Sequence, residues 1–299
     1  MTILLLVIIY LCFISLGLPD SLLGSAWSLI HLDFNVDISL MGIVSMIISM
    51  STIVSSLFSD KLNRKFGTYA IVIISIFLTA FSLLGFSLAP NFIIMCLIAV
   101  PYGLGAGAID ASLNNYVALN FKSKHMSFLH SFWGIGTIVS PYIMGFSIKN
   151  YSSWQKGYLL VSIIQFAIAI IVCCSYPVWK NKKIQEKDDN VVPKNLTLGI
   201  ILLVIPNVNY YVSVVGFIIC GMGAGPIYPA IVHSTPDNFG KENSQGIIGL
   251  QMAFAYIGST FTPLLFGLIS SALGIEILPF CFLFFLIIFC VLFIFLQKK

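Results

Sequence analysis

The sequence has few charged residues. Asp, Glu, Lys and Arg make up 9% of its 299 residues, whereas about 25% of the residues in an ordinary soluble domain are charged. Hydrophobic residues make up 59% of the chain, and the mean hydropathy is +1.01. These values exclude a soluble globular protein. The formal net charge of +4 is too small, and the charges are too scattered, for a nucleic-acid-binding protein.

Several chemical motifs are also missing. None of the seven cysteines forms a C-x-x-C pair, and all lie inside apolar runs, where a thiol packs as a small hydrophobic group. The sequence therefore predicts neither a disulfide framework nor a zinc site. It has no H-E-x-x-H, G-x-S-x-G or paired-Asp metal motif, which argues against a polytopic membrane enzyme. We expect no enzymatic activity, no metal and no cofactor.

No removable leader is predicted, because the first apolar run begins at residue 3 without a basic segment or a small-residue cleavage site. A membrane span needs about 20 apolar residues. Nine runs meet this need: 3–30, 39–59, 68–89, 91–119, 127–148, 157–176, 210–234, 245–270 and 275–296. A tenth run, 195–206, is short, since about twelve residues at 1.5 Å each reach roughly 18 Å. We expect ten crossings.

The positions of Lys and Arg predict the orientation, because positively charged loops stay in the cytoplasm. With both termini cytoplasmic, only Lys149 and Lys156 fall outside. The inner loops and tail then hold 13 of the 15 basic residues: Lys61, Arg64, Lys65, Lys122, Lys124, Lys180, Lys182, Lys183, Lys187, Lys194, Lys241, Lys298 and Lys299. We therefore expect a multi-pass protein of the cell membrane. If 195–206 does not cross, the last three helices are inverted.

An internal repeat divides the chain. Residues 103–110 read GLGAGAID and residues 221–228 read GMGAGPIY. The two copies run in the same direction, which indicates parallel repeats about an axis along the membrane normal. The longest polar stretch, 178–194, predicts a solvated cytoplasmic linker between an N-terminal six-helix bundle at 1–177 and a shortened bundle at 195–299.

The offset between the repeats indicates a deletion. From Gly103 to Gly221 the chain advances by 118 residues and fits four spans, about 30 residues each. Two six-span repeats need six spans between equivalent positions, or about 180 residues at the same spacing. About 60 residues, the length of two helices, are therefore missing between the linker and the short run at 195–206.

One loop motif resembles a family signature. Residues 59–67, SDKLNRKFG, between the second and third spans, resemble the D-R-x-G-R-R motif of the major facilitator superfamily, with Asp60, Lys61, Arg64 and Lys65 in register. Asn63 stands where the family prefers glycine, and Ser56 replaces the leading glycine.

Four further segments are similar to the branch of fucose and glucose proton symporters: 17–27, 106–120, 128–136 and 228–245. The resemblance implies an all-α, polytopic membrane helix bundle of major facilitator type with parallel six-helix repeats, the second of them shortened. It further implies proton-coupled uptake of a sugar or a similar small polar solute by alternating access. The implied partners are the solute, the proton and the lipid bilayer.

Asp20 and Asp110 are the only carboxylates deep within predicted spans. A charged Asp at mid-span costs roughly 2.5 to 3.5 kcal/mol, so such a residue normally faces a cavity or a partner. A carboxyl group there can bind and release a proton near neutral pH. The resemblance implies proton coupling at both residues and sugar binding. The alternative is a neutral, hydrogen-bonded carboxyl group that joins helices.

Further residues are candidates for solute binding. Asn114 shares a helix face with Asp110 and lies beside Asn115, and amides and carboxylates together suit sugar hydroxyls. Bonding between helices is the alternative for the amides. Trp133 offers an aromatic face for a sugar ring. The C-terminal repeat supplies Tyr228, which aligns with Asp110 in the repeat, together with His233, Gln251 and Tyr256.

Other residues are candidates for gating. Pro19 cannot donate to the carbonyl of Ser15, so it predicts a helix break beside Asp20. We interpret Asp60, Lys61, Arg64 and Lys65 as an inner-face latch, with a plain positively charged loop as the alternative. His130 and His233 lie near the cytoplasmic face and are gate or interface candidates. The glycines Gly103, Gly105 and Gly107 follow no strand and predict close helix packing, with no phosphate site.

The deletion leaves two further hypotheses open. A chain of this ancestry without two helices could have lost transport. Its shortened half, with three full helices, cannot surround a cavity as six would. We therefore expect low stability, a leak, or a homodimer that buries the exposed polar faces of spans one, four and ten.

Overall fold

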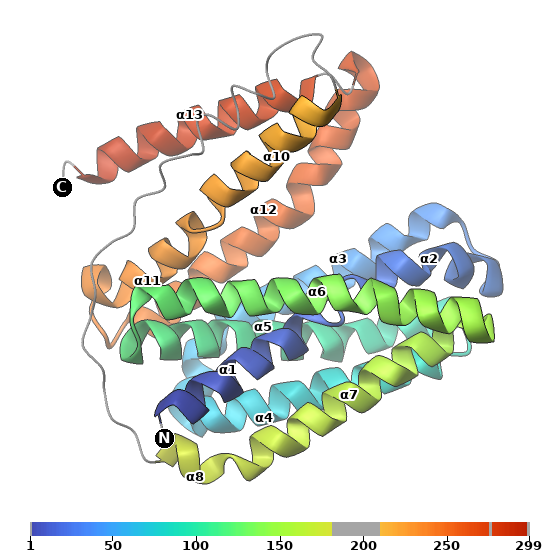
Figure 1. The fold of residues 1–299 in the computed structure, drawn as a ribbon, viewed down its shortest axis with the longest axis horizontal. Coiled ribbons are helices and arrows are strands. Elements are labelled where there is room, and N and C mark those ends of the chain that lie inside the picture. The colour runs from blue at the N-terminus through green and yellow to red at the C-terminus, as the bar shows by residue number, and fades with distance from the viewer. Residues whose placement is uncertain (1, 181–209, 275–276, 298–299) are drawn as a thin grey trace. The chain divides into compact units, whose positions relative to one another are not determined.

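The computed structural model describes residues 2–180, 210–274 and 277–297 (Figure 1). Within these ranges the regular secondary structure is entirely helical, which confirms the predicted all-α fold. The helices are α1 (Thr2–Gly17), α2 (Leu22–Asp33), η1 (Ile38–Leu40), α3 (Met41–Leu57), α4 (Ser59–Ser87), α5 (Phe92–Asn120), α6 (Ser123–Tyr151), α7 (Trp154–Cys174), α8 (Tyr176–Lys180), α10 (Tyr210–Ala224), α11 (Ile227–Phe239), α12 (Ser244–Leu273) and α13 (Leu278–Gln297).

Seven segments of the described chain are long and apolar enough to cross a membrane: Ile3–Asp33, Ile38–Leu57, Ser59–Ser87, Phe92–Asn120, Ser123–Tyr151, Trp154–Cys174 and Ser244–Leu273. They coincide with the first six predicted spans and with the run at 245–270. The short run at 195–206 and most of the 178–194 linker lie outside the described residues. The total of ten membrane crossings stays a prediction.

The chain divides into two compact units, each considered by itself. The first contains α1 to α8, most of α11 and the start of α12, because Ile231–Gly258 groups with the N-terminal helices. The second contains α10 and α13 together with the rest of α11 and α12. All close contacts described below lie within the first unit.

Glycines allow α5 to pack closely between α3 and α4. A Cβ atom added at Gly103 would collide with the carbonyl oxygen of Ile48, and one at Gly107 would collide with that of Thr52. At Gly105 the added atom would lie 3.0 Å from the carbonyl oxygen of α4 residue Ser75. Small residues let backbones in membrane proteins approach closely. The predicted packing role of this glycine run is confirmed.

The predicted break at Pro19 is also confirmed. The helix α1 ends at Gly17, and α2 begins at Leu22. Proline has no backbone N–H and cannot continue the helical hydrogen-bond ladder. Gly17 lies against the backbone of α6, where an added Cβ would collide with the carbonyl of Trp133. Asp20 is thus held in the break beside α6.

The structure corrects one local expectation. The segment 59–67 was expected as a loop, but it forms the first turns of α4, which kinks at Gly67 with φ of 77°. Residues such as Lys, Leu and Arg favour helix, and glycine adopts a positive φ without steric strain. The signature residues therefore project from a helix.

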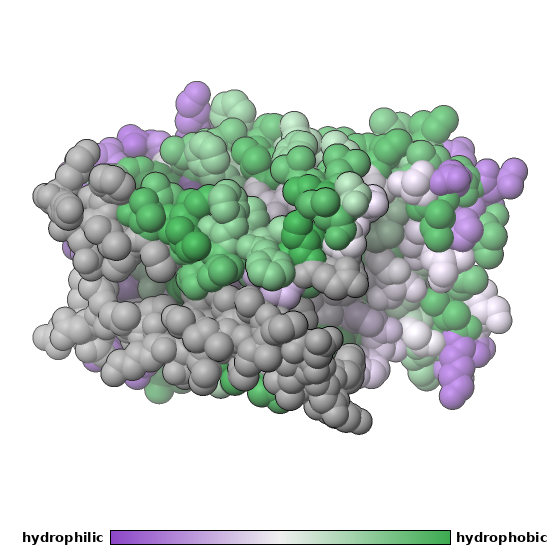
Figure 2. Space-filling model, turned by 90° about the horizontal axis from the view of Figure 1, so that it is seen from above, coloured by the Kyte–Doolittle hydropathy of each residue, from purple (hydrophilic) through white to green (hydrophobic). Residues whose placement is uncertain are grey.

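The exposed surface agrees with a membrane protein. Figure 2 shows many hydrophobic side chains on the face that it draws, with fewer hydrophilic ones among them. Large apolar side chains of α6, including Ile138, Tyr142 and Phe146, are exposed. Lipid is the solvent that such a surface requires.

Candidate functional site

The carboxyl group of Asp110 is buried in the first unit and held from two sides. Asp110 lies on α5 with 7% of its surface exposed. Its Oδ2 atom accepts a hydrogen bond of 2.7 Å from the hydroxyl group of Tyr256 on α12. Its Oδ1 atom accepts one of 2.8 Å from Nδ2 of Asn114. The carboxyl group therefore joins α5 to α12.

Asn114 lies one helical turn after Asp110, as its spacing predicts. Its Nδ2 atom donates both to Oδ1 and to the backbone oxygen of Asp110, at 2.8 and 2.9 Å. Both bonds stay within α5. The Oδ1 atom of Asn114 is buried and finds no hydrogen-bond donor in the part of the chain that the structure describes. Because buried polar atoms are normally hydrogen-bonded, this oxygen is suited to accept a hydrogen bond from a ligand.

Asp20 has a different environment. Its Oδ2 atom accepts a hydrogen bond of 2.8 Å from Nε1 of Trp133 on α6. Its Oδ1 atom accepts one of 3.3 Å from the hydroxyl group of Tyr102 on α5. Asp20 itself is exposed, whereas Asp110 is buried. The two carboxyl groups thus differ in access, although both accept hydrogen bonds from two side chains.

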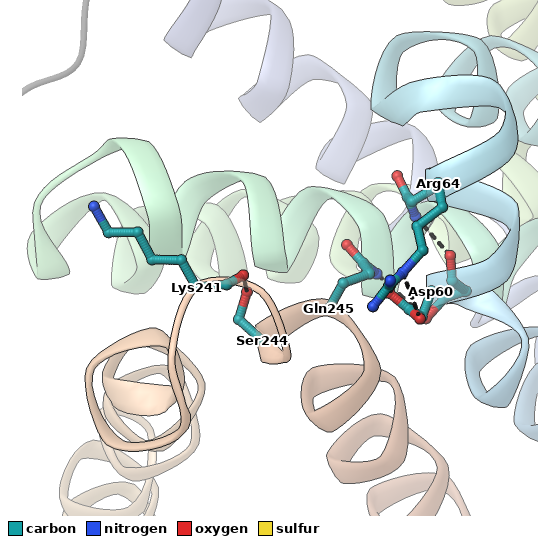
Figure 3. Close-up of polar contacts among 7 residues, drawn as sticks. Asp60, Arg64, Lys241, Ser244 and Gln245 are labelled. Atoms are coloured by element: carbon teal, nitrogen blue, oxygen red, sulfur yellow. Dashed lines mark hydrogen bonds and ion pairs between the residues drawn. The ribbon is translucent and has the colours of Figure 1, made fainter.

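A second polar cluster lies where the start of α12 meets α4 and α5. We call it the amide cluster: Ser59, Ala111, Asn115, Ser244 and Gln245. Nε2 of Gln245 donates to the hydroxyl of Ser59 at 3.2 Å and to the backbone oxygen of Ala111 at 3.3 Å. The hydroxyl of Ser244 donates to Oδ1 of Asn115 at 2.7 Å. Figure 3 shows Gln245 next to the first turn of α4.

Close backbone contact supports the amide cluster. A Cβ atom added at Gly249, one turn after Gln245, would collide with the backbone oxygen of Ser56 on α3. At Gly246 the nearest atom to an added Cβ is Cβ of Asp60, at the ordinary distance of 3.7 Å. Of these two glycines, only Gly249 is therefore required for the approach of the helices.

The predicted latch residues lie at the start of α4. Asp60 and Arg64 form an ion pair of 3.0 Å within the helix, and Figure 3 shows it beside Gln245. Lys61 and Lys65 lie over the rings of Phe58 and Phe66, at 5.4 and 5.2 Å. Asp60 also lies beside Gly246 in the first turn of α12. A carboxylate is favourable at a helix N-terminus.

Asn63 occupies the position where the signature prefers glycine. Its Nδ2 atom donates to the hydroxyl of Ser112 on α5 at 2.7 Å and to the backbone oxygen of Ser59 at 3.0 Å. The departure from the signature thus adds a hydrogen bond between α4 and α5, next to residues of the amide cluster.

The other predicted site residues are dispersed. His130 is half-buried, with its ring edge-on to Phe13 at 5.7 Å. His233 is buried on α11, and Gln251 accepts a hydrogen bond of 3.1 Å from Thr235. Tyr228 belongs to the second unit, so its role in solute binding stays a prediction.

Sequence reasoning assigned no role to Tyr102, Ser244 or Gln245, and it gave Tyr256 no partner. A signal for the α12 residues exists in the spacing of Gln245, Gly249 and Tyr256. Intervals of four and seven residues place them on one helix face. The spacing shows that they share a face, but the partner of that face appears only in the folded chain.

Comparison with known proteins decides the family. The model of the Major Facilitator Superfamily matches residues 9–195 and 195–299. The chain belongs to the Major Facilitator Superfamily. As a member of this family, it is a multi-pass membrane protein. The two matched segments meet at residue 195, where the repeat offset predicts the two missing spans.

Individual relatives of this major facilitator chain are distant. It is similar to bypass of stop codon protein 6 of Saccharomyces cerevisiae, with 23% identity over 183 residues. That match covers 59% of this chain and 35% of the yeast protein, so the chain spans about a third of this curated relative.

Solved structures agree on the fold. The crystal structure of the transporter FucP in the outward conformation matches with a TM-score of 0.64 at 12% identity. A crystal structure of a single-residue variant of the E. coli fucose:proton symporter FucP matches with a TM-score of 0.63 at 14% identity. Each match covers 93% of this chain and 95% of the other.

Proposed function

We propose that this protein moves a small polar solute, such as a sugar, into the cell together with a proton by alternating access. The supporting observation is the pair of unlike carboxyl groups in the first unit. Asp110 is buried between Asn114 and Tyr256, while Asp20 is exposed at a helix break. Ionisable residues within spans typically serve solute or proton pathways. The fold likeness to a fucose:proton symporter supports the same proposal.

In this proposal Asp110 and Asn114 recognise the solute. A carboxylate accepts hydrogen bonds from sugar hydroxyls, and an amide both donates and accepts. The buried Oδ1 atom of Asn114 supplies an acceptor beside the carboxyl group. Trp133 is 38% exposed, which leaves ring surface for stacking while its N–H group holds Asp20. Tyr228 and Gln251 are proposed contacts from the C-terminal repeat.

Asp20 and Asp110 together serve proton coupling, and Asp20 is the group that exchanges its proton with the outside. Its exposure supports this assignment, because proton exchange requires access to water. Inward movement of one proton contributes about 2.3 kcal/mol per 100 mV. That energy suffices for modest accumulation of a neutral solute.

The amide cluster is the proposed inner gate, with Asp60, Lys61, Arg64 and Lys65 beside it. It joins the start of α12 to α4 and α5 by side-chain bonds that can break without unfolding a helix. Asn115 then belongs to the gate, because it accepts its bond from Ser244. Pro19, His130 and His233 are proposed conformational residues. The contact also supports the predicted topology, since it puts the start of α12 beside the basic start of α4.

The test is transport by the purified protein in liposomes. We expect uptake of radiolabelled fucose or glucose when the outside is acidified, and loss of accumulation when a protonophore is added. The matched control is Asp110→Asn, in which the side-chain shape is kept but the charge is removed. Absence of saturable uptake, exchange and solute-dependent proton movement for these sugars would favour the transport-incompetent alternative that the missing helices suggest.

A further inference from the structure

One face of α12 contacts both the proposed inner gate, which is the amide cluster, and the proposed solute-binding residue Asp110. Gln245, Gly249, Met252 and Tyr256 follow one another at intervals of four, three and four residues. This spacing places them on the same side of the helix. Gln245 and Met252 are buried, and Tyr256 is half-buried. From Gln245 to Tyr256, the face therefore packs against the N-terminal helices of the same unit.

The two ends of this face contact different sites. At the beginning, Ser244 and Gln245 bond to Asn115, Ser59 and Ala111. Eleven residues later, the hydroxyl group of Tyr256 donates to Oδ2 of Asp110. At 1.5 Å per residue the two positions are about 16 Å apart along the axis.

The helix between these contacts has no interruption. The only proline of α12 is Pro263, which lies beyond Tyr256. A continuous helix transmits a tilt or a shift of one end to the other. Movement that separates Gln245 from Ser59 must therefore also move the backbone that positions Tyr256.

We infer that Tyr256 is a positioning residue that couples Asp110 to closure of the amide cluster; this inference rests on the proposed function and adds a mechanism to it. The hydroxyl group reaches Oδ2 of Asp110 while α12 is seated on α5. A hydrogen bond to a carboxylate is roughly twice as strong as a neutral one. The hydrogen bond from Tyr256 to the Asp110 carboxylate thus helps to hold the amide cluster closed.

The same geometry gives the solute a way to open the cluster. A solute hydroxyl that donates to Oδ2 of Asp110 competes with Tyr256 for that oxygen. When Tyr256 is displaced, α12 loses its hydrogen bond to Asp110 and keeps its bonds within the amide cluster. Gln245 has a buried Oε1 atom without a hydrogen-bond partner among the described residues, so those contacts leave a polar group unsatisfied. Solute binding at Asp110 therefore weakens closure of the amide cluster at the other end of this helix face.

The experiment measures access to a buried position of α12 in the full chain. Ala253 is 2% exposed and lies between the two contacts, so Ala253→Cys in a background without native cysteines reports separation of α12 by its rate of N-ethylmaleimide labelling. We expect Tyr256→Phe to raise this rate about ten-fold, the effect of losing one hydrogen bond to a charged group.

Two matched controls isolate the role of Tyr256. Tyr102→Phe removes the hydroxyl group that donates to the other carboxylate, Asp20, so the labelling rate at Ala253→Cys should not change. Ala169→Cys reports on the core of α7, where the residue is fully buried. Labelling there should stay negligible in Tyr256→Phe. A rise at both positions would mean general loosening and would overturn the inference.

A double-mutant cycle tests whether Tyr256 acts through Asp110. Asp110→Asn alone should also raise labelling, and adding Tyr256→Phe should raise it little further, because the effects of residues in contact are not additive. Independent, multiplicative effects or an unchanged rate in Tyr256→Phe would overturn the inference. Labelling requires no solute and no transport, so failure of the transport assay leaves this result intact.

Hydrogen exchange gives the same comparison without cysteine replacement. In the chain with its native cysteines, Tyr256→Phe should speed amide exchange in peptides covering 244–256, and Tyr102→Phe should not. Equal exchange in the two variants would contradict the proposed role of Tyr256.

Discussion

The indole N–H group of Trp133 donates a hydrogen bond of 2.8 Å to the carboxyl group of Asp20. This bond joins a residue of α6 to the break between α1 and α2. Asp20 keeps an exposed surface, whereas the other intramembrane carboxyl group, Asp110, is buried. The difference in access supports different tasks for the two residues.

Asp20→Asn should abolish proton-driven accumulation and retain exchange of internal for external solute. Asparagine forms hydrogen bonds but does not titrate, and exchange requires no net proton transfer. Uptake driven by a pH gradient and counterflow without a gradient measure the two activities in the same liposomes. Accumulation at the parent rate and with the parent pH dependence would contradict a coupling role for Asp20.

Asp110→Asn should weaken solute binding itself, by about ten-fold or more. The change replaces a charged acceptor of solute hydroxyls with a neutral one, and a hydrogen bond to a charged group contributes about 1.5 to 3 kcal/mol. Calorimetric titration of the detergent-purified variant measures the affinity, with Asp20→Asn as the matched control. Equal affinities in the parent and Asp110→Asn would show that this carboxyl group does not contact the solute.

Gly249→Ala should destabilise the packing of α12 against Ser56, because the added Cβ would collide with a backbone oxygen. Overpacking of this kind costs typically about 1 to 3 kcal/mol. Gly246→Ala is the control, since its Cβ would make an ordinary contact of 3.7 Å with Asp60. Thermal unfolding in detergent should show a lower melting temperature for Gly249→Ala alone. Equal melting temperatures would argue against close packing at Gly249.

The predicted topology puts Asn150 outside and Lys241 inside. In a background without native cysteines, Asn150→Cys should react with an impermeant thiol reagent added to intact cells, and Lys241→Cys should react only after the membrane is opened. Labelling of Lys241→Cys from outside would mean that the 195–206 run does not cross and that the last three helices are inverted.

A homodimer is expected if the shortened second half leaves polar groups of the bundle uncovered. Polar groups that stay uncovered within a span are unfavourable in lipid. Light scattering of the protein in mild detergent gives the mass of the complex, which should be that of a dimer. A stable monomer that binds solute tightly and saturably would contradict this expectation.

Local features of the sequence were sufficient for much of the fold. Apolar runs predicted the spans because a helix in lipid must be about 20 residues long. Pro19 predicted the break before Leu22, and Gly103, Gly105 and Gly107 predicted close packing, because backbone chemistry acts within a few residues. The same locality explains the pairing of Asn114 with Asp110. The start of α4 was misjudged, because its charged residues suggested a loop although they favour helix.

The contacts of α12 were decided only by the tertiary structure. The bonds from Tyr256 to Asp110, from Ser244 to Asn115 and from Gln245 to Ser59 join residues 146, 129 and 186 positions apart. Hydropathy determines that a helix crosses the membrane, but its rotation and depth relative to a neighbour depend on side-chain packing. Residue order therefore determined that two carboxyl groups lie within spans, and packing determined that Asp110 is covered by Tyr256 while Asp20 stays exposed.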